Sequence, residues 1–487
     1  MVTQDIEISE AEYPSASTLC YQPAVNFSRL RKHHIVLAGT IFAFNASLGT
    51  SLPSGASSFI AAAFEISEND IRIVLLNSLY LVGFVVGPLF FGPLSECVGR
   101  RPVMIGTYLA YTFFTLGCAL SPTFQSLLVF RFFCGLSGSA PNAVLSGLYS
   151  DIYDEPNRRG RAMVIFFFTA MAGPMAGPLV SGFTVLVSWR WVFWVALIIA
   201  GPGVPFILLL PETYSPVLER QKAKSLQMDE KAHTTRAQFS ARKIFIRPFS
   251  MLLKEPIVSF TSLYLSFVYG ILFLFFQAYP IIFKGIYGLS NGLNGLAFIP
   301  SVFPTPILPK KICKTHSTTV IFGSFLGLCV ALVYASYHNK AVAAGQSWCS
   351  VEEYRRLPLA CIGAPSIVIA LFWLGWSSYK SIHPAVPMMA GIFFGFGYLL
   401  VFTALLNYLT DAYKEASASA QAAASSTRAM MAVVLPFAAT PMYTKLGIHW
   451  ASSLLGFFAF ALAWIPFAFI KYGRLIREKS GIVVEPH

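Results

Sequence analysis

The chain has 487 residues, of which 55% are hydrophobic and only 12% are charged, and its mean hydropathy is +0.63. Soluble domains carry roughly 25% charged residues, so this composition excludes an ordinary soluble protein and predicts a chain that lies largely in lipid. The formal net charge of +13 does not indicate nucleic-acid binding, because in a membrane chain the position of basic residues sets the topology.

Long apolar runs follow one another along most of the sequence, and a transmembrane helix needs about 20 such residues. Six runs lie near 36–60, 73–94, 103–120, 126–149, 162–187 and 191–210. After a polar interval, six more lie near 257–283, 319–337, 357–377, 384–409, 416–440 and 449–470. The pattern predicts an all-α membrane protein with twelve transmembrane helices in two six-helix bundles.

These runs divide the chain into five expected regions. They are a cytoplasmic N-terminal tail (1–34), an N-terminal bundle (35–210), a basic cytoplasmic linker (211–254), a C-terminal bundle (255–470) and a cytoplasmic C-terminal tail (471–487). Basic residues cluster in the tails, the linker and the turns after the second and fourth spans, which the positive-inside rule places in the cytoplasm. The start lacks the pattern of a cleaved signal peptide, so the first span is expected to direct its own insertion.

The stretch 298–318 departs from this pattern, because it combines Pro300, Pro304, Pro306 and Pro309 with three lysines. Such repeated prolines break a spanning helix, and the lysines would face outside, against the charge rule. Two explanations stay open: a non-native insertion such as unspliced sequence, which would leave the chain inactive, or a genuine long outer loop.

The turn between the second and third spans reads GPLSECVGRRP. A glycine, an acid four residues later and then Gly-Arg-Arg resemble the signature of the major facilitator superfamily in this loop, although Glu96 stands where most members have aspartate. The resemblance implies an inner gate that holds two bundles together until they rock apart, with Glu96 holding Arg100 or capping a helix N-terminus. The expected gate residues are Gly92, Glu96, Gly99, Arg100, Arg101 and Asp151.

Arg131 is a lone cation inside the apolar fourth span. Insertion of a charge there costs about 2.5 to 3.5 kcal/mol on translocon scales, so the side chain should face the bundle interior or a wet cavity. Arg131 and Gly135 match a pair that the family associates with proton handling. The alternative is that Arg131 snorkels to a membrane interface.

The fifth span contains two Gly-Pro steps, Gly173-Pro174 and Gly177-Pro178, followed by Gly182. Glycines four residues apart share a helix face and allow close helix packing, and the prolines add a bend. This pattern resembles the antiporter signature of the family, which favours export over uptake. Close packing without a functional meaning remains the alternative.

Polar and aromatic residues within otherwise apolar spans are the candidates for a substrate cavity and for coupling. They include Asn45, Gln277, Tyr279, Asn407 and Arg428, together with Arg131. Aromatic walls with few polar groups suit amphipathic or aromatic ligands, although a single tyrosine is more often a core residue. No Asp or Glu lies in the middle of a span, and Gln277 stands where related exporters often have glutamate, which weakens the case for proton coupling.

Looser similarity extends over about residues 35–470 to fungal drug:proton antiporters, including multidrug and polyamine exporters. It includes the segments Trp189–Trp191, Pro211–Thr213 and Asn407–Tyr413. The resemblance implies a secondary active transporter that exports small organic molecules by alternating access in exchange for protons. Such a carrier would act as a monomer in the plasma membrane without nucleic acid.

No phosphate loop, nucleophile elbow or metal cluster occurs in the sequence, and the eight cysteines lack metal-ligand spacing. We therefore expect neither an enzyme nor a cofactor. Two other functions stay open. An uptake carrier of the same fold would move substrate in the opposite direction, and a non-transporting membrane sensor or receptor would bind ligand without flux.

Overall fold

The computed structural model describes residues 24–67, 70–219, 241–287, 320–413 and 417–478. The regular elements within these ranges are all helices. The proline-rich stretch 298–318 lies outside the described residues.

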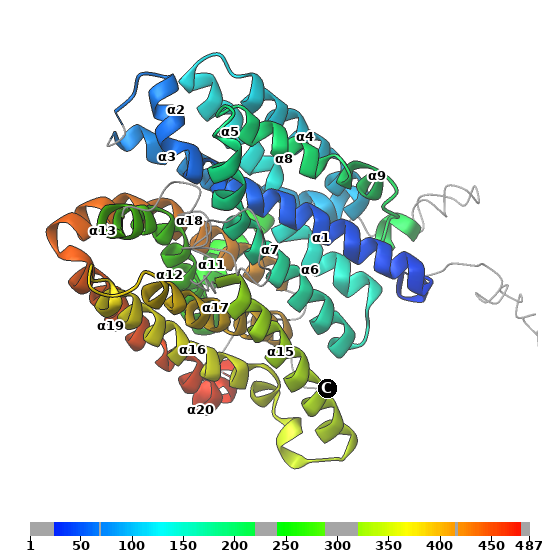
Figure 1. Ribbon diagram of the computed structural model, residues 1–487. Helices are drawn as coiled ribbons and strands as arrows, with labels where there is room; N and C mark the ends of the chain where they lie inside the picture. The colour runs from blue at the N-terminus through cyan, green and yellow to red at the C-terminus, as the bar shows by residue number, and fades with distance from the viewer. Residues whose placement is uncertain (1–23, 68–69, 220–240, 288–319, 414–416, 479–487) are drawn as a thin grey trace, which may run out of the picture.

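The first group of helices fills the upper part of Figure 1, in blue to green. Its elements are η2 Ala24–Asn26, α1 Arg29–Ser51, η3 Leu52–Ala56, α2 Ser57–Ala63, α3 Ile71–Val98, α4 Arg100–Leu120, α5 Phe124–Gly138, α6 Ala140–Ile152, α7 Pro156–Thr184, α8 Trp191–Ala200 and α9 Gly203–Leu208. Within this group α1 packs on α7, and α3 packs on α5.

The second group fills the lower part of the same view, in green to red. Its elements are α11 Ala241–Lys254, α12 Pro256–Tyr279, η4 Pro280–Lys284, α13 Gly285–Tyr287, α15 Val320–Ala343, η5 Ser347–Ser350, α16 Glu352–Ser377, α17 Ala385–Ala412, α18 Ser417–Lys445, α19 Gly447–Leu462 and α20 Trp464–Glu478. Here α16 packs on α17, α12 on α18, and α15 on α17.

Ten helical stretches of the described residues are long and apolar enough to cross a membrane. They are Arg29–Ala63, Arg72–Val98, Arg100–Leu120, Phe124–Ile152, Arg158–Thr184, Pro256–Tyr287, Glu353–Ser377, Ala385–Ala412, Ser419–Lys445 and Gly447–Arg477. Each coincides with one of the apolar runs in the sequence, which confirms an all-helical, multi-pass membrane protein.

The other two apolar runs are also helical. The run near 191–210 gives the 10-residue helix α8, which ends before Gly201 and Pro202, and then the 6-residue helix α9. The run near 319–337 corresponds to the 24-residue helix α15, Val320–Ala343.

Glycines allow two helix pairs to approach backbone to backbone. Gly83 of α3 meets Gly135 of α5, and Gly323 of α15 meets the backbone of α17 close to Gly395. A methyl group on any of these four glycines would overlap backbone atoms of the facing helix. Small residues serve this purpose in membranes, where close van der Waals contact takes the place of a hydrophobic driving force.

The two groups touch along α3, α6 and α7 on one side and α15, α17 and α18 on the other. The Ser426 hydroxyl of α18 donates to the Val85 carbonyl of α3 at 3.0 Å. The Ser324 hydroxyl of α15 lies 3.1 Å from the Met171 sulfur of α7. This surface is where a movement of one group against the other would break contacts.

Two parts of the expected linker 211–254 belong to the described residues. Helix α11 occupies its last 14 residues and packs against α12 and α18. Its beginning, directly after α9, packs against the turn between α3 and α4, as described below. Residues 220–240 of the linker lie outside the described part of the chain.

Candidate functional site

The turn between α3 and α4 consists of a single residue, Gly99, with φ of +113°. L residues that carry a side chain rarely adopt this backbone conformation, whereas glycine does so readily. A Cβ at Gly99 would also overlap the carboxylate of Glu212. Glycine is therefore required here both by the backbone angle and by the approach of an acidic side chain.

Glu212 caps the N-terminus of α4 from a distant part of the chain. Its Oε1 accepts from the Arg100 backbone nitrogen at 2.9 Å, and its Oε2 accepts from the Arg101 nitrogen at 3.2 Å. Oε1 also accepts from the nitrogens of Thr213 and Tyr214, each at 3.0 Å. A carboxylate at this position satisfies free helix N–H groups and complements the positive end of the helix dipole.

The Arg100 side chain joins three elements to the segment after α9. It donates to the Ser95 hydroxyl of α3 at 2.5 Å and approaches Asp151 of α6 at 3.5 Å. Its guanidinium lies 5.0 Å from the centre of the Tyr214 ring. Thr213 also donates to Asp151, at 3.3 Å. The buried arginine therefore holds α3, α4, α6 and the start of the linker together.

The structure places Glu96 differently from the interpretation of the sequence. Glu96 is exposed, and among the described residues it has no hydrogen-bond or ion-pair partner. The preceding residue, Ser95, faces Arg100 instead, because successive residues of a helix point about 100° apart. The cap and the ion pair predicted for Glu96 are made by Glu212 and Asp151.

Two other predicted gate residues, Gly92 and Arg101, lie around this network. The space beside Gly92 would accept a side chain, since a Cβ there would be in ordinary contact with Ala143 at 3.7 Å. The Arg101 side chain is exposed, and its backbone supplies the second bond to Glu212.

A second ion-pair cluster connects the two helix groups. The Asp411 carboxylate of α17 lies 3.4 Å from Arg159 of α7 and 3.0 Å from Arg356 of α16. The three side chains are 13–25% exposed. Since α7 begins just after Asp151 at the end of α6, this cluster lies at the same end of the molecule as the Gly99 turn.

Sequence reasoning did not select Glu212, Arg159, Arg356 or Asp411 as gate residues. For Glu212 a signal existed, because the Pro-Glu-Thr segment follows the sixth apolar run and should lie on the same face as the Gly-Arg-Arg turn. The other three resemble ordinary charges at helix ends, and only the fold brings them together.

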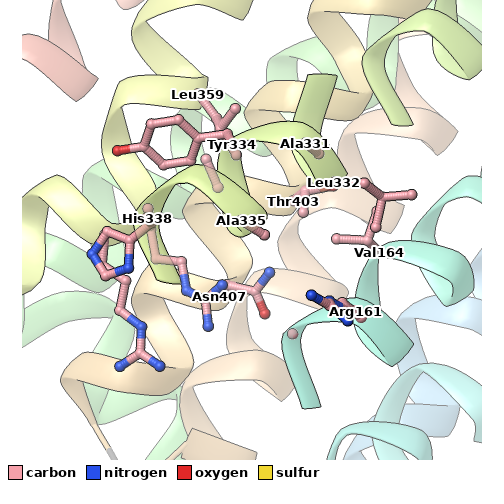
Figure 2. Close-up of a pocket in the computed structure, with 14 residues that line it drawn as sticks. Arg161, Val164, Ala331, Leu332, Tyr334, Ala335, His338, Leu359, Thr403 and Asn407 are labelled. Atoms are coloured by element: carbon pink, nitrogen blue, oxygen red, sulfur yellow. The ribbon is translucent and has the colours of Figure 1, made fainter. Parts of the chain in front are cut away.

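A pocket lies next to this cluster, between α7, α15, α16 and α17 (Figure 2). Its polar side chains include Asn407, Thr403, His338 and Arg161. Asn407 is buried, and its amide nitrogen has no hydrogen-bond partner among the described residues. The sequence-predicted Asn407 therefore lines a small, mostly apolar pocket with a few polar side chains at the gate end of the second group.

The Gly-Pro steps of α7 form its contact with α1. A Cβ at Gly173 would lie 2.7 Å from the Leu48 nitrogen, and one at Gly177 would lie 3.0 Å from the Leu52 nitrogen. One turn further, the Gly182 nitrogen would lie 3.0 Å from a Cβ on Gly55. Helix α7 can therefore approach α1 and η3 (Leu52–Ala56) this closely only with glycine at these positions.

The prolines of α7 leave a backbone carbonyl free for α1. Pro178 has no N–H to donate to the carbonyl of Pro174, four residues earlier. The Ser51 hydroxyl donates to this carbonyl instead, at 2.5 Å. The hydrogen bond that the helix loses at proline is thus replaced by one between two helices.

Arg131 and Asn45 lie inside the first group. Arg131 is 2% exposed, donates to the Leu76 carbonyl at 2.9 Å and lies 4.4 Å from the centre of the Tyr80 ring. This burial disagrees with the snorkelling alternative. The Asn45 amide donates to the Ile41 carbonyl at 2.9 Å.

The other interior candidates lie in the second group. Tyr279 is buried and stacks on Phe275 at 5.3 Å, whereas Gln277 is half-buried and has no hydrogen bond within the described residues. Arg428 of α18 is 8% exposed. Within the described chain, no hydrogen bond connects Arg131 or Asn45 with this set.

Comparison with known proteins supports this architecture. The sequence model of the Major Facilitator Superfamily matches residues 39–436. The efflux pump FUBT of Fusarium oxysporum is 35% identical over 480 residues, which cover 95% of this chain and 76% of the relative. The multidrug transporter mdrA of Aspergillus fumigatus is 34% identical, covering 93% and 73%. A transporter from the ascochitine biosynthesis cluster of Didymella fabae is 34% identical, covering 87% and 80%.

Two solved structures share the fold. The human organic anion transporter MFSD10 (TETRAN) aligns with a TM-score of 0.58 at 16% identity, covering 90% of this chain and 98% of its own. The proton:xylose symporter XylE aligns with a TM-score of 0.60 at 15% identity, covering 92% and 96%. Together with the match over residues 39–436, these likenesses establish that the chain belongs to the major facilitator superfamily of membrane transporters.

Proposed function

We propose that this transporter exports small organic molecules, of the drug, toxin or secondary-metabolite type, by alternating access. Support comes from relatives that are named efflux pump, multidrug transporter and biosynthesis-cluster transporter. The packing of α7 on α1 through Gly173 and Gly177 also agrees with the antiporter-type pattern of the sequence.

One observation supports alternating access in particular, namely the ion-pair cluster of Arg159, Asp411 and Arg356 between the two helix groups. Partly exposed ion pairs are weak, about 0 to 1 kcal/mol each, so thermal motion and substrate can break them. The cluster is therefore suited to a gate that opens and closes, together with the network around Arg100.

The architecture that we propose has twelve spans in two six-helix bundles, 35–210 and 255–470. In this arrangement α8 with α9 forms the sixth span and α15 forms the eighth. Both tails and the linker 211–254 face the cytoplasm, as the distribution of basic residues favours. We also propose that the transporter works as a monomer in the plasma membrane, as the resemblance to drug:proton antiporters implies.

Protons are the proposed coupling ion. Carboxylates of the described residues lie at helix ends, so exchange of a proton must act there. Asp151 is the candidate, because its carboxylate contacts both Arg100 and Thr213. Protonation of Asp151 would weaken its contact with the arginine that holds α4 in place, which would connect proton uptake to movement at the gate.

The test compares cells that lack the transporter with cells that express it, challenged with a panel of radiolabelled organic toxins. Export predicts that expression lowers the accumulation of at least one compound, and that dissipating the pH gradient restores it. Higher accumulation on expression would indicate the uptake carrier. Binding to the purified protein without flux in proteoliposomes would indicate a sensor.

A further inference from the structure

Arg428 is a cation buried in the second helix group, and no described residue provides an anionic partner for it. It lies on α18, is 8% exposed, and donates one hydrogen bond, to the Ser425 hydroxyl at 3.1 Å. Its other terminal nitrogen, Nη1, is fully buried and has no partner. Among the described residues no carboxylate forms an ion pair with it.

Such an arrangement is unfavourable unless something else interacts with the charge. Burial of a guanidinium without hydrogen bonds or a counter-ion costs several kcal/mol. The Phe402 ring, whose centre lies 5.9 Å from the Arg428 guanidinium carbon, compensates for only a part of this, because a cation–π contact contributes roughly 0.5 to 2 kcal/mol. Intramembrane arginines whose N–H donors have no acceptor typically mark a binding site.

The surroundings of Arg428 are aromatic and contain further hydrogen-bond donors. Tyr398 stacks on Phe402 with ring centres 4.1 Å apart, and Tyr269 lies 6.1 Å from Phe402. The hydroxyls of Tyr269 and Tyr398 make no hydrogen bond within the described part of the chain. A buried guanidinium and two phenols thus present donors without acceptors beside an aromatic wall.

Arg428 also lies where the two helix groups meet. Helix α18 contacts α12 and α17 of its own group and α3 and α6 of the other. Two residues before Arg428, Ser426 donates to the Val85 carbonyl of α3 at 3.0 Å. A movement that separates α18 from α3 would therefore open a path towards this arginine.

We infer that Arg428, Tyr269 and Tyr398 form a subsite for the carboxylate of an aromatic or amphipathic organic acid. The carboxylate accepts from Nη1 of Arg428 and from the phenols, and the apolar part of the ligand packs on the Phe402 and Tyr398 rings. This inference rests on the proposed transport function and narrows its substrates to organic anions.

The test uses the purified full-length protein and a matched pair of probes, 1-naphthoate and the neutral 1-naphthamide. The wild-type protein should bind the acid more tightly than the amide, by about ten- to a hundredfold, which is the range of a charge-assisted hydrogen bond. Arg428→Gln should abolish this preference, Arg428→Lys should retain part of it, and Tyr398→Phe should reduce it. Arg72→Gln removes an exposed arginine and should leave the preference unchanged.

Thermal unfolding distinguishes the subsite from a structural role. Without ligand, Arg428→Gln should unfold at the same temperature as wild type or a higher one, because an unpaired buried charge is removed. A lower unfolding temperature of Arg428→Gln without ligand, equal affinity for the acid and the amide, or an unchanged preference in this variant would each overturn the inference.

Flux measurements in proteoliposomes separate this inference from the proposed function. Flux of both the acid and the neutral probe that is insensitive to Arg428→Gln would reject the anion subsite and leave the transport function standing. Binding of naphthoate through Arg428 without flux of any probe would support the subsite and reject the transport function.

Discussion

The carboxylate of Glu212 lies 2.9 Å from the backbone nitrogen of Arg100, although 112 residues separate the two in sequence. The first turn of α4 is therefore fixed by the segment that leaves the last helix of the first group. Because the same segment begins the linker, the gate and the connection between the two groups share one set of hydrogen bonds. This arrangement leads to the first prediction.

Replacement of Glu212 by glutamine should lower the free energy of unfolding by about 1 to 2 kcal/mol, the usual range for loss of a helix cap. Glutamine keeps one acceptor oxygen but loses the charge and the second bond, to Arg101. Thermal unfolding of the purified protein measures the loss. Backbone hydrogen exchange of Arg100 and Arg101 should become faster in the variant.

The control is Glu219→Gln, which removes an exposed glutamate from the same segment. It should unfold like the wild type. Equal unfolding temperatures for the Glu212 and Glu219 variants would show that the cap contributes nothing.

Two glycines of this region should respond in opposite directions to alanine. Gly99→Ala places a methyl group against Glu212 at a φ of +113° and should destabilise by about 1 to 3 kcal/mol. Gly106→Ala, in the middle of α4, meets nothing within 4 Å and should stabilise by up to about 1 kcal/mol, because alanine favours the helix.

The measurement is the unfolding temperature of both variants in the same detergent. Destabilisation by Gly106→Ala, or a neutral effect of Gly99→Ala, would contradict the geometry of the turn.

Hydropathy alone predicted most of the fold, since ten of the apolar runs became long apolar helices. Hydropathy was less successful where an apolar run contains residues that end a helix. The run near 191–210 is apolar throughout, yet Gly201 and Pro202 end α8 after 10 residues. Apolar character predicts location in the membrane, whereas the backbone at glycine and proline decides where a helix stops.

The candidate site was predictable only in its local part. The Gly-Arg-Arg turn could be recognised from its resemblance to the superfamily signature, and Asp151 was noted as an acid at the end of a span. The partners that complete the site come from far along the chain: Arg159 and Asp411 are 252 residues apart. Nothing in the local sequence distinguishes such a charge from one that faces water, because the pairing depends on how the two helix groups pack.

Arg159→Gln should favour opening at the gate end, because it removes an ion pair between the helix groups and leaves Asp411 with Arg356. If the ion pair stabilises the closed state by about 1 kcal/mol, its removal changes the ratio of open to closed states about fivefold. Hydrogen–deuterium exchange of the backbone around Arg159 and Asp411 should increase by a similar factor.

Arg158→Gln is the matched control, since the ion pair of Arg158 within the described residues is with the exposed Glu155, 2.7 Å away at the N-cap of α7. Its exchange should equal that of the wild type. Identical exchange in the Arg158 and Arg159 variants would remove the cluster from the gate.

The bond between Ser51 and Pro174 can be tested with a double-mutant cycle. In the wild-type chain Ser51→Ala leaves the Pro174 carbonyl without a donor and should destabilise by about 1 to 3 kcal/mol. In the Pro178→Ala background the new backbone N–H at residue 178 can donate to that carbonyl within α7, so the same serine substitution should have little effect. The difference between the two values, measured by thermal unfolding, is the coupling between a serine of α1 and a proline of α7.

Transport assays on these variants connect the bond to function. If α7 bends and pivots against α1 during transport, Pro178→Ala should slow flux even where it raises the unfolding temperature, because a continuous helix resists bending. Ser51→Ala alone should lower stability with a smaller effect on flux, since both prolines remain. Equal loss of stability from Ser51→Ala in both backgrounds would mean that the serine acts through packing and that its hydroxyl does not replace the hydrogen bond missing at Pro178.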